Sequence, residues 1–156
     1  MISVVQRVTS ASVTVADPPH HAEIAAGLCV LLAIEQSDHS RDVKWMAGKL
    51  ANLRIFRDAE GKMNRSVKDV AGEILLISQF TLAGDCSTGN RPSFISAARP
   101  DVGRGLYEAV AKQLVTDHGV PVKTGVFGAM MAVQINNDGP VTLILNSPRR
   151  DGVEPT

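Results

Sequence analysis

The chain has few cysteines, few aromatic residues and no long apolar run. Two of its 156 residues are cysteine, and aromatic residues make up 4% of the sequence. Cys29 lies in an apolar stretch and Cys86 in a polar one, so we expect two free thiols rather than a disulfide framework or a zinc site. No apolar run approaches the roughly 18 residues that a membrane span needs, which predicts a protein that does not span a membrane.

The chain also lacks a net charge and a secretory signal. Sixteen basic residues balance sixteen acidic residues, which argues against a protein that coats nucleic acid through its overall field. A local basic patch is compatible with these totals, and the candidates for phosphate contacts are Arg91, Lys62, Arg65 and Lys68. The first residues show no basic segment followed by an apolar stretch, so we expect a cytoplasmic protein.

The usual catalytic groups are missing as well. None of the four histidines sits at the end of an apolar strand, and His20 and His21 have no cysteine or carboxylate at metal-ligand spacing. The glycines do not form a loop of the phosphate-binding or dinucleotide-binding type. We therefore expect no metal and no cofactor. Any catalysis must depend on backbone groups, hydroxyls and atoms of the substrate.

Apolar periodicity predicts several strands and two helices. Helical spacing of apolar residues predicts one helix that Ser37, Asp38 or Ser40 could cap and a second helix over residues 101–118. Residues 53–56 are expected to be extended. The expected strands are residues 2–8, 11–15, 27–35, 73–80, 121–127, 129–136 and 141–146, with the last two forming a hairpin.

This order of elements predicts an α+β fold, with a mixed β-sheet covered by two main helices. Residues 1–146 form the expected domain, and residues 147–156 form a polar C-terminal tail. About fifteen apolar strand positions exceed what two helices can cover, so a second copy of the chain is expected to cover the remaining surface. The sequence therefore predicts a homodimer whose sheets pack across the interface.

Two short stretches place polar or special-backbone residues where an apolar strand ends. In residues 78–82, a serine, a glutamine and a threonine carry hydrogen-bonding groups that a buried strand would have to satisfy. In residues 137–142, a proline removes a backbone donor, and the Gly-Pro bond before it can be cis. Each stretch also has a plainer interpretation, as the frayed end of a core strand and as an Asp-Gly hairpin.

Together, the two stretches resemble the signatures Ser-Gln-Phe-Thr-Leu and Asn-x-Gly-Pro-Val-Thr of the D-aminoacyl-tRNA deacylases of the bacterial and eukaryotic type. The resemblance covers residues 1–146 and includes, in family order, residues 5–8, 52–56, 61–64, 91–94 and 125–129. Two separate motifs in their expected order are far more specific than either motif alone. The resemblance implies a homodimer that hydrolyses the ester between a D-amino acid, or glycine, and the terminal adenosine of tRNA.

The resemblance also implies roles for individual residues. The implied pocket and catalytic residues, which hold the amino acid and the terminal ribose, are Ser78, Gln79, Phe80 and Thr81. The implied substrate-binding residues are Gly139 and Pro140, which enter in a cis conformation from the other subunit, the facing residues Phe127, Gly128 and Ala129 with Met131 nearby, and Arg7, which holds the Gly-Pro pair.

The implied mechanism is a chirality filter, in which main-chain carbonyl oxygens of the Gly-Pro pair exclude an L side chain. Amides around Phe80 and Thr81 are expected to stabilise the developing negative charge, and Thr81 to position rather than attack, since no base is evident. Met130 stands where the family commonly has an acidic residue, and strand alternation places it on the face opposite Met131. The alternatives are a dimeric nucleic-acid-binding homologue without turnover and a dimer that binds a small molecule.

Overall fold

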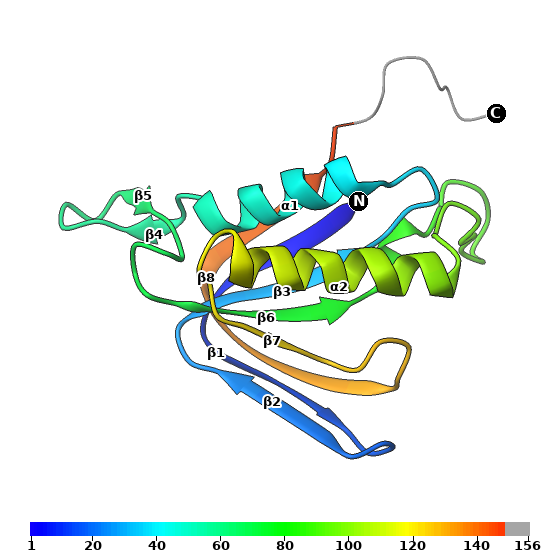
Figure 1. Ribbon diagram of the computed structural model, residues 1–156, viewed down its shortest axis with the longest axis horizontal. Helices are drawn as coiled ribbons and strands as arrows, with labels where there is room; N and C mark the ends of the chain where they lie inside the picture. Colours follow the sequence, from blue (N-terminus) through cyan, green and yellow to red (C-terminus); the bar gives the residue numbers. More distant parts are fainter. Residues whose placement is uncertain (149–156) are drawn as a thin grey trace.

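One long strand forms the centre of the β-sheet (Figure 1). The computed structural model describes residues 1–148. Strand β1 (Ile2–Val15) pairs antiparallel with β3 (Gly27–Ala33) along its first half and with β2 (His20–Ile24) along its second half. Strand β8 (Met131–Asn146) pairs antiparallel with β1 along both halves. Strands β2, β3 and β8 therefore all pair with β1.

Parallel strands extend the sheet on the other side of β3. Strand β6 (Glu73–Ser78) pairs with β3, and the short strand β7 (Val122–Thr124) pairs with β6. Strand β3 and the middle of β6 are buried on both faces, as is usual for parallel strands that lie inside a domain. A separate ribbon of β4 (Phe56–Arg57) and β5 (Met63–Arg65) follows the first helix.

Both helices cover the same face of the sheet (Figure 1). Helices α1 (Ser40–Asn52) and α2 (Pro100–Thr116) pack against one another and close a core that includes Leu50 and Val110. A second core around Leu75 lies on the opposite face, inside the curled part of the sheet. The α+β fold with two main helices is thus confirmed. Neither helix in residues 1–148 has the length and apolar character of a membrane span.

Strand β8 replaces the hairpin that the sequence predicted over residues 129–146. Asn137 and Thr142 both pair with β1, on either side of Arg7. Residues 138–141 therefore bulge out opposite Arg7 instead of reversing the chain direction. The hairpin prediction is wrong because β1 is long enough to pair with the chain on both sides of the Asp-Gly-Pro sequence, which overrides the local turn signal.

Other element boundaries also differ from the prediction. The expected break at residues 9–10 is only an irregularity of register inside the continuous strand β1. Strand β2 was not predicted, because its sequence has no run of apolar residues and its pairing depends on the backbone of β1. The expected strand over residues 73–80 ends at Ser78. Both cysteines are free thiols, as predicted.

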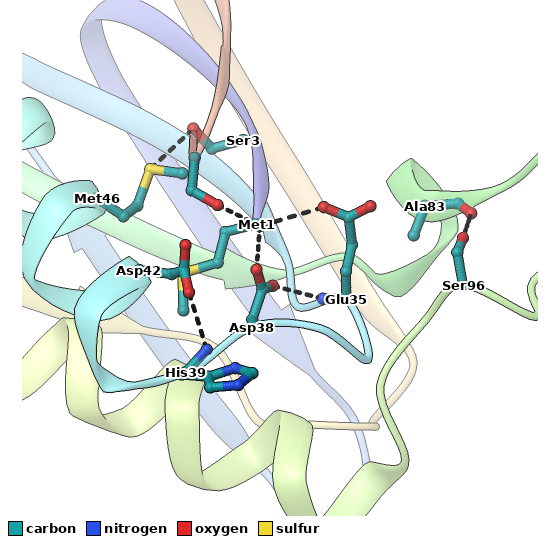
Figure 2. A network of polar contacts seen from close by, with 10 residues as sticks. Met1, Ser3, Glu35, Asp38, His39, Asp42, Met46, Ala83 and Ser96 are labelled. Atoms are coloured by element: carbon teal, nitrogen blue, oxygen red, sulfur yellow. Dashed lines mark hydrogen bonds and ion pairs between the residues drawn. The ribbon is translucent and has the colours of Figure 1, made fainter. Parts of the chain in front are cut away.

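The first residue of the chain lies in an acidic cluster beside α1 (Figure 2). The amine of Met1 lies 2.5 Å from Oδ1 of Asp38 and 3.1 Å from Oε2 of Glu35, and it donates to Oγ of Ser147 at 2.8 Å. Asp38 also accepts a hydrogen bond from the N–H of Glu35. The N-cap of α1 is His39 rather than one of the three residues that the sequence indicated, and Ser40 is the first residue of the helix.

The expected polar tail falls mostly outside the described residues. Its first residue, Ser147, is buried and its N–H donates to the carbonyl oxygen of Met1 at 2.9 Å. Ser147 is therefore packed against the domain.

Candidate active site

A cleft of about 370 Å³ lies where β6 ends. Its walls come from the ends of β3 and β6, from Gly103 of α2, from the loop that follows β7 and from the first residues of β8. Ser78 and Gln79 are the polar residues of the lining, and none of the lining residues is charged. The cleft therefore offers apolar surface with a few hydrogen-bonding groups, which suits a small organic group held by its shape.

The end of β6 is fixed by hydrogen bonds rather than frayed. The N–H of Gln79 donates to the carbonyl oxygen of Leu32 at 2.9 Å, which extends the pairing of β3 with β6. The chain then enters a short 3-10 helix, Phe80–Ala83, and the first N–H groups of such a helix have no carbonyl partner within it. Nε2 of Gln79 donates to Oγ1 of Thr81 at 2.5 Å. The amides of Phe80 and Thr81 are thus positioned at the strand end, next to the cleft.

Two glycines shape the loop that forms the facing wall of the cleft. Gly128 has a φ of +79°, a left-handed conformation that side chains rarely adopt. A Cβ atom at Gly125 would lie 2.4 Å from Sδ of Met131. Glycine at this position therefore leaves room for the methionine at the start of β8. The ring of Phe127 packs against Tyr107 of α2, with 5.8 Å between the ring centroids.

The Gly139–Pro140 pair lies in the exposed bulge of β8, and its peptide bond is cis. Arg7, opposite the bulge, is buried. Its Nη1 donates to the carbonyl oxygen of Ile55 at 2.5 Å, and its Nε lies 2.7 Å from Oδ2 of Asp138. The Nε–H is not directed at that oxygen, so this contact is an ion pair rather than a hydrogen bond. A buried cation therefore ties the base of the bulge to β1.

Comparison with known proteins assigns the chain to a family. Residues 4–146 match the family model described as D-Tyr-tRNA(Tyr) deacylase. The chain belongs to this family. It is 51% identical to a protein of Chlorobaculum parvum named D-aminoacyl-tRNA deacylase, over 96% of this chain and 100% of that protein. It is 54% identical to a protein of the same name from Desulfitobacterium hafniense, over 96% of this chain and 99% of that protein.

Two solved structures resemble this deacylase-family chain. A protein described as c-Myc DNA Unwinding Element Binding Protein superposes with a TM-score of 0.89 and 43% identity, over 96% of this chain and 100% of that chain. A probable eukaryotic D-amino acid tRNA deacylase superposes with a TM-score of 0.80, over 92% of this chain and 97% of that chain. The second is 18% identical and therefore shows the fold alone.

The structure brings together seven of the site residues that the resemblance to the deacylases implied. The residues that line the cleft together are Ser78, Gln79, Phe80, Phe127, Gly128, Ala129 and Met131. The residues that do not line it are Thr81, Gly139, Pro140 and Arg7. Thr81 is linked to the cleft through Gln79, whereas the other three lie at the bulge of β8.

Several residues of the cleft were not predicted from the sequence. Leu32, Ala98 and Gly103 line it, but apolar and small residues carry no signal that separates a binding wall from ordinary core. Met130 also borders the cleft and is 92% exposed, whereas Met131 is partly buried. The expected start of this strand at residue 129 is wrong, because β8 begins only at Met131 and Met130 belongs to the preceding loop.

The basic residues proposed as phosphate contacts are widely separated in this deacylase-family chain. Lys62 and Arg65 lie on the β4–β5 ribbon, at the end of the molecule away from the loop that follows β6 (Figure 1). Lys62 pairs with Glu60, and Arg65 donates to the carbonyl oxygen of Asp69. No three His, Cys, Asp or Glu residues within residues 1–148 are arranged to hold a metal ion.

Proposed function

We propose that this protein hydrolyses the ester bond between a D-amino acid, or glycine, and the terminal adenosine of tRNA. The observation that carries the proposal is the cleft in which the strand-end residues 78–80 meet residues 127–131. Family membership and the names of relatives about half identical along nearly the whole chain support the same activity. Because its substrate belongs to translation, we place the protein in the cytoplasm.

We propose that the working form is a homodimer in which the bulge of one protomer enters the cleft of its partner. The Gly139–Pro140 pair is exposed and does not line the cleft of its own chain. Strand β8 is an edge strand with an exposed apolar side chain, Ile144, at 67% exposure. An uncovered edge of this kind is a surface that a second copy can cover.

In this arrangement the bulge selects the chirality of the aminoacyl group of the substrate. Main-chain carbonyl oxygens of Gly139–Pro140 occupy the space that an L side chain would need, so an L substrate meets a clash and leaves polar groups unpaired. Glycine has no side chain and passes the filter. Since the filter does not grip the D side chain, many D-amino acids are accepted.

The chemical step uses main-chain groups. The amides of Phe80 and Thr81, which have no partner within their own 3-10 helix, stabilise the negative charge that develops on the ester carbonyl oxygen. Thr81 positions the substrate rather than attacking it, because its hydroxyl oxygen is contacted by the amide of Gln79, which cannot accept a proton. A ribose hydroxyl of the substrate assists the attacking water.

The decisive experiment incubates the purified protein with tRNA charged with the D or the L form of one amino acid. Release from the D substrate with the L substrate retained supports the proposal. Binding of either tRNA without release would favour a nucleic-acid-binding homologue without turnover. Neither binding nor release would point to a small-molecule dimer, and equal release of both enantiomers would disprove the filter.

The role of Thr81 is tested by Thr81→Ala. We expect the variant to keep deacylation near the native rate, which would exclude Thr81 as the nucleophile. Loss of the rate with intact substrate binding would instead make Thr81 the nucleophile. Thr88, an exposed threonine of the following loop, offers the matched control Thr88→Ala.

The shared site is tested by mixing two inactive variants, Phe80→Ala and Pro140→Ala. If each site combines the strand end of one protomer with the bulge of its partner, a mixed dimer contains one site with both changes and one intact site. Random exchange then restores about a quarter of the native sites. No recovery after exchange would show that both residues act within one chain.

A further inference from the structure

Arg104 of α2 lies at the rim of the cleft. Its guanidinium carbon is 5.3 Å from the centroid of the Phe127 ring, and the neighbouring Gly103 lines the cleft together with Phe127. Guanidinium groups are attracted to the face of an aromatic ring at this separation. The contact therefore holds a positive charge beside a cleft whose own lining is uncharged.

The N–H groups of Arg104 are available for a ligand. Arg104 is exposed, and within residues 1–148 it makes no hydrogen bond or ion pair. The nearby acidic residue Asp101 is instead 3.7 Å from Nε of Arg99, and both of these side chains are largely exposed. A guanidinium carries five N–H donors, and pairs of these donors match the oxygens of a phosphate.

We propose that Arg104 binds the phosphate that joins the terminal adenosine to the preceding nucleotide of the tRNA. This inference rests on the proposed function. The ribose that carries the ester lies in the cleft, and the same ribose carries the phosphate, so the phosphate must leave the cleft through its mouth. Arg104 carries its positive charge beside the cleft, against Phe127 of the lining. Lys62 and Arg65 belong instead to the β4–β5 ribbon, which lies at the end of the molecule away from the loop that follows β6 (Figure 1).

The contact with Phe127 has a second consequence. Phe127 contacts two residues of α2, with the ring centroid of Tyr107 at 5.8 Å and the guanidinium carbon of Arg104 at 5.3 Å from its own ring centroid. A role in placing this ring would affect every substrate, whereas a phosphate contact affects only substrates that carry the phosphate. The two roles can therefore be separated by the choice of substrate.

The test compares wild type, Arg104→Gln and Arg104→Lys on two substrates. One is D-aminoacyl-tRNA, and the other is the D-aminoacyl ester of adenosine, which has no phosphate. For tRNA we expect Arg104→Gln to raise KM about tenfold with kcat unchanged, and to reduce the slope of log(kcat/KM) against log salt concentration by about 0.7. The KM of Arg104→Lys should lie between those of wild type and Arg104→Gln, because lysine keeps the positive charge but lacks the paired N–H donors of the guanidinium. For the adenosine ester, all three proteins should be equal.

Lys112→Gln serves as the matched control, since Lys112 lies on the same helix but in the groove between α1 and α2. It should behave as wild type on both substrates. Equal losses of Arg104→Gln on both substrates would overturn the phosphate contact in favour of a role in placing Phe127. No loss on either substrate would also overturn it. If wild type cleaves neither substrate, the proposed function fails. This outcome is distinguishable from failure of the phosphate contact, which is judged by comparing the losses of Arg104→Gln on the two substrates.

Discussion

Arg7 of β1 and Asp138 of β8 form an ion pair across the point where the pairing of the two strands is interrupted. Nε of Arg7 lies 2.7 Å from Oδ2 of Asp138, and the two side chains are 3% and 48% exposed. The buried end of the pair also donates to the carbonyl oxygen of Ile55. The bulge that carries Gly139 and Pro140 is therefore attached to the domain through the buried guanidinium of Arg7. Removing the carboxylate partner would leave this positive charge buried and unpaired, which is costly.

Asp138→Asn should reduce the free energy of unfolding by about 1–2 kcal/mol, less than for a fully buried pair because Asp138 is half exposed. Urea unfolding measures this difference. Asp101→Asn is the control, since its pair with Arg99 is exposed on both sides and should contribute nothing measurable. If the two variants are equally stable, the ion pair between Arg7 and Asp138 does not contribute to the stability of the domain.

Much of the fold followed from the sequence because its signals are local. The helical spacing of Val43, Met46 and Leu50 corresponds to the buried face of α1, and the apolar run before Ser78 corresponds to the buried strand β6. The form of β8 could not be predicted in this way. Whether residues 137–142 turn or bulge depends on the length of β1, which lies far away in the sequence.

The site was also predicted only in part, because some of its residues give a local signal in the sequence and others do not. The polar residues at the end of β6 stand out in the sequence, and the structure places Ser78 and Gln79 in the cleft. Gly103 and Arg104 carry no such signal, since a glycine and an arginine on a helix are common at any surface. Their position at the rim depends on the packing of α2 against the loop that contains Phe127.

Gly125→Ala should disturb the cleft through Met131. The new Cβ would lie 2.4 Å from Sδ of Met131 and 3.3 Å from Cδ1 of Ile77, so the methionine must move. We expect a loss of about 1–3 kcal/mol in the free energy of unfolding, as for other overpacked sites, and a lower kcat/KM for the D substrate.

The double variant Gly125→Ala/Met131→Ala tests this explanation. Removing the methionine removes the clash, so the cost of Gly125→Ala should be smaller in the Met131→Ala background, with a coupling of about 1 kcal/mol or more. Denaturant unfolding of the four proteins gives the coupling. Additive costs of the two substitutions would show that a clash with Met131 is not the cause of the destabilisation by Gly125→Ala.

Asp38→Asn should destabilise the domain more than a typical surface change. Its carboxylate lies 2.5 Å from the amine of Met1, and the side chains of Met1 and Asp38 are 0% and 4% exposed. The substitution leaves the amine buried with Glu35 as its remaining carboxylate (Figure 2), and we expect a loss of about 2–3 kcal/mol. Asp42→Asn, at the exposed start of α1, is the control and should lose about 1 kcal/mol or less. Thermal unfolding that ranks the two variants in the opposite order would contradict this account.

Tyr107 gives the stability of the protein a predictable dependence on alkaline pH. It is the single tyrosine of the chain, its hydroxyl donates to the carbonyl oxygen of Leu76 at 2.7 Å, and burial raises its pKa, with a smaller contribution from Glu108. The folded state therefore holds the phenol proton more tightly than the unfolded state does. Above the unfolded pKa of about 10, the unfolded state loses this proton first, and the free energy of unfolding falls as pH rises.

Phenolate absorbance of the native protein reports this group alone, and its titration midpoint should lie well above that of the protein in denaturant. Tyr107→Phe should remove this part of the alkaline loss of stability and cost about 1 kcal/mol at neutral pH, because the carbonyl oxygen of Leu76 still accepts the N–H of Gly125. The variant keeps its ring against Phe127, so deacylation should be retained, whereas Tyr107→Ala should lose it. A native midpoint near 10 would mean that the hydroxyl is accessible to solvent, and the packing of a buried Tyr107 against Phe127 would then be wrong.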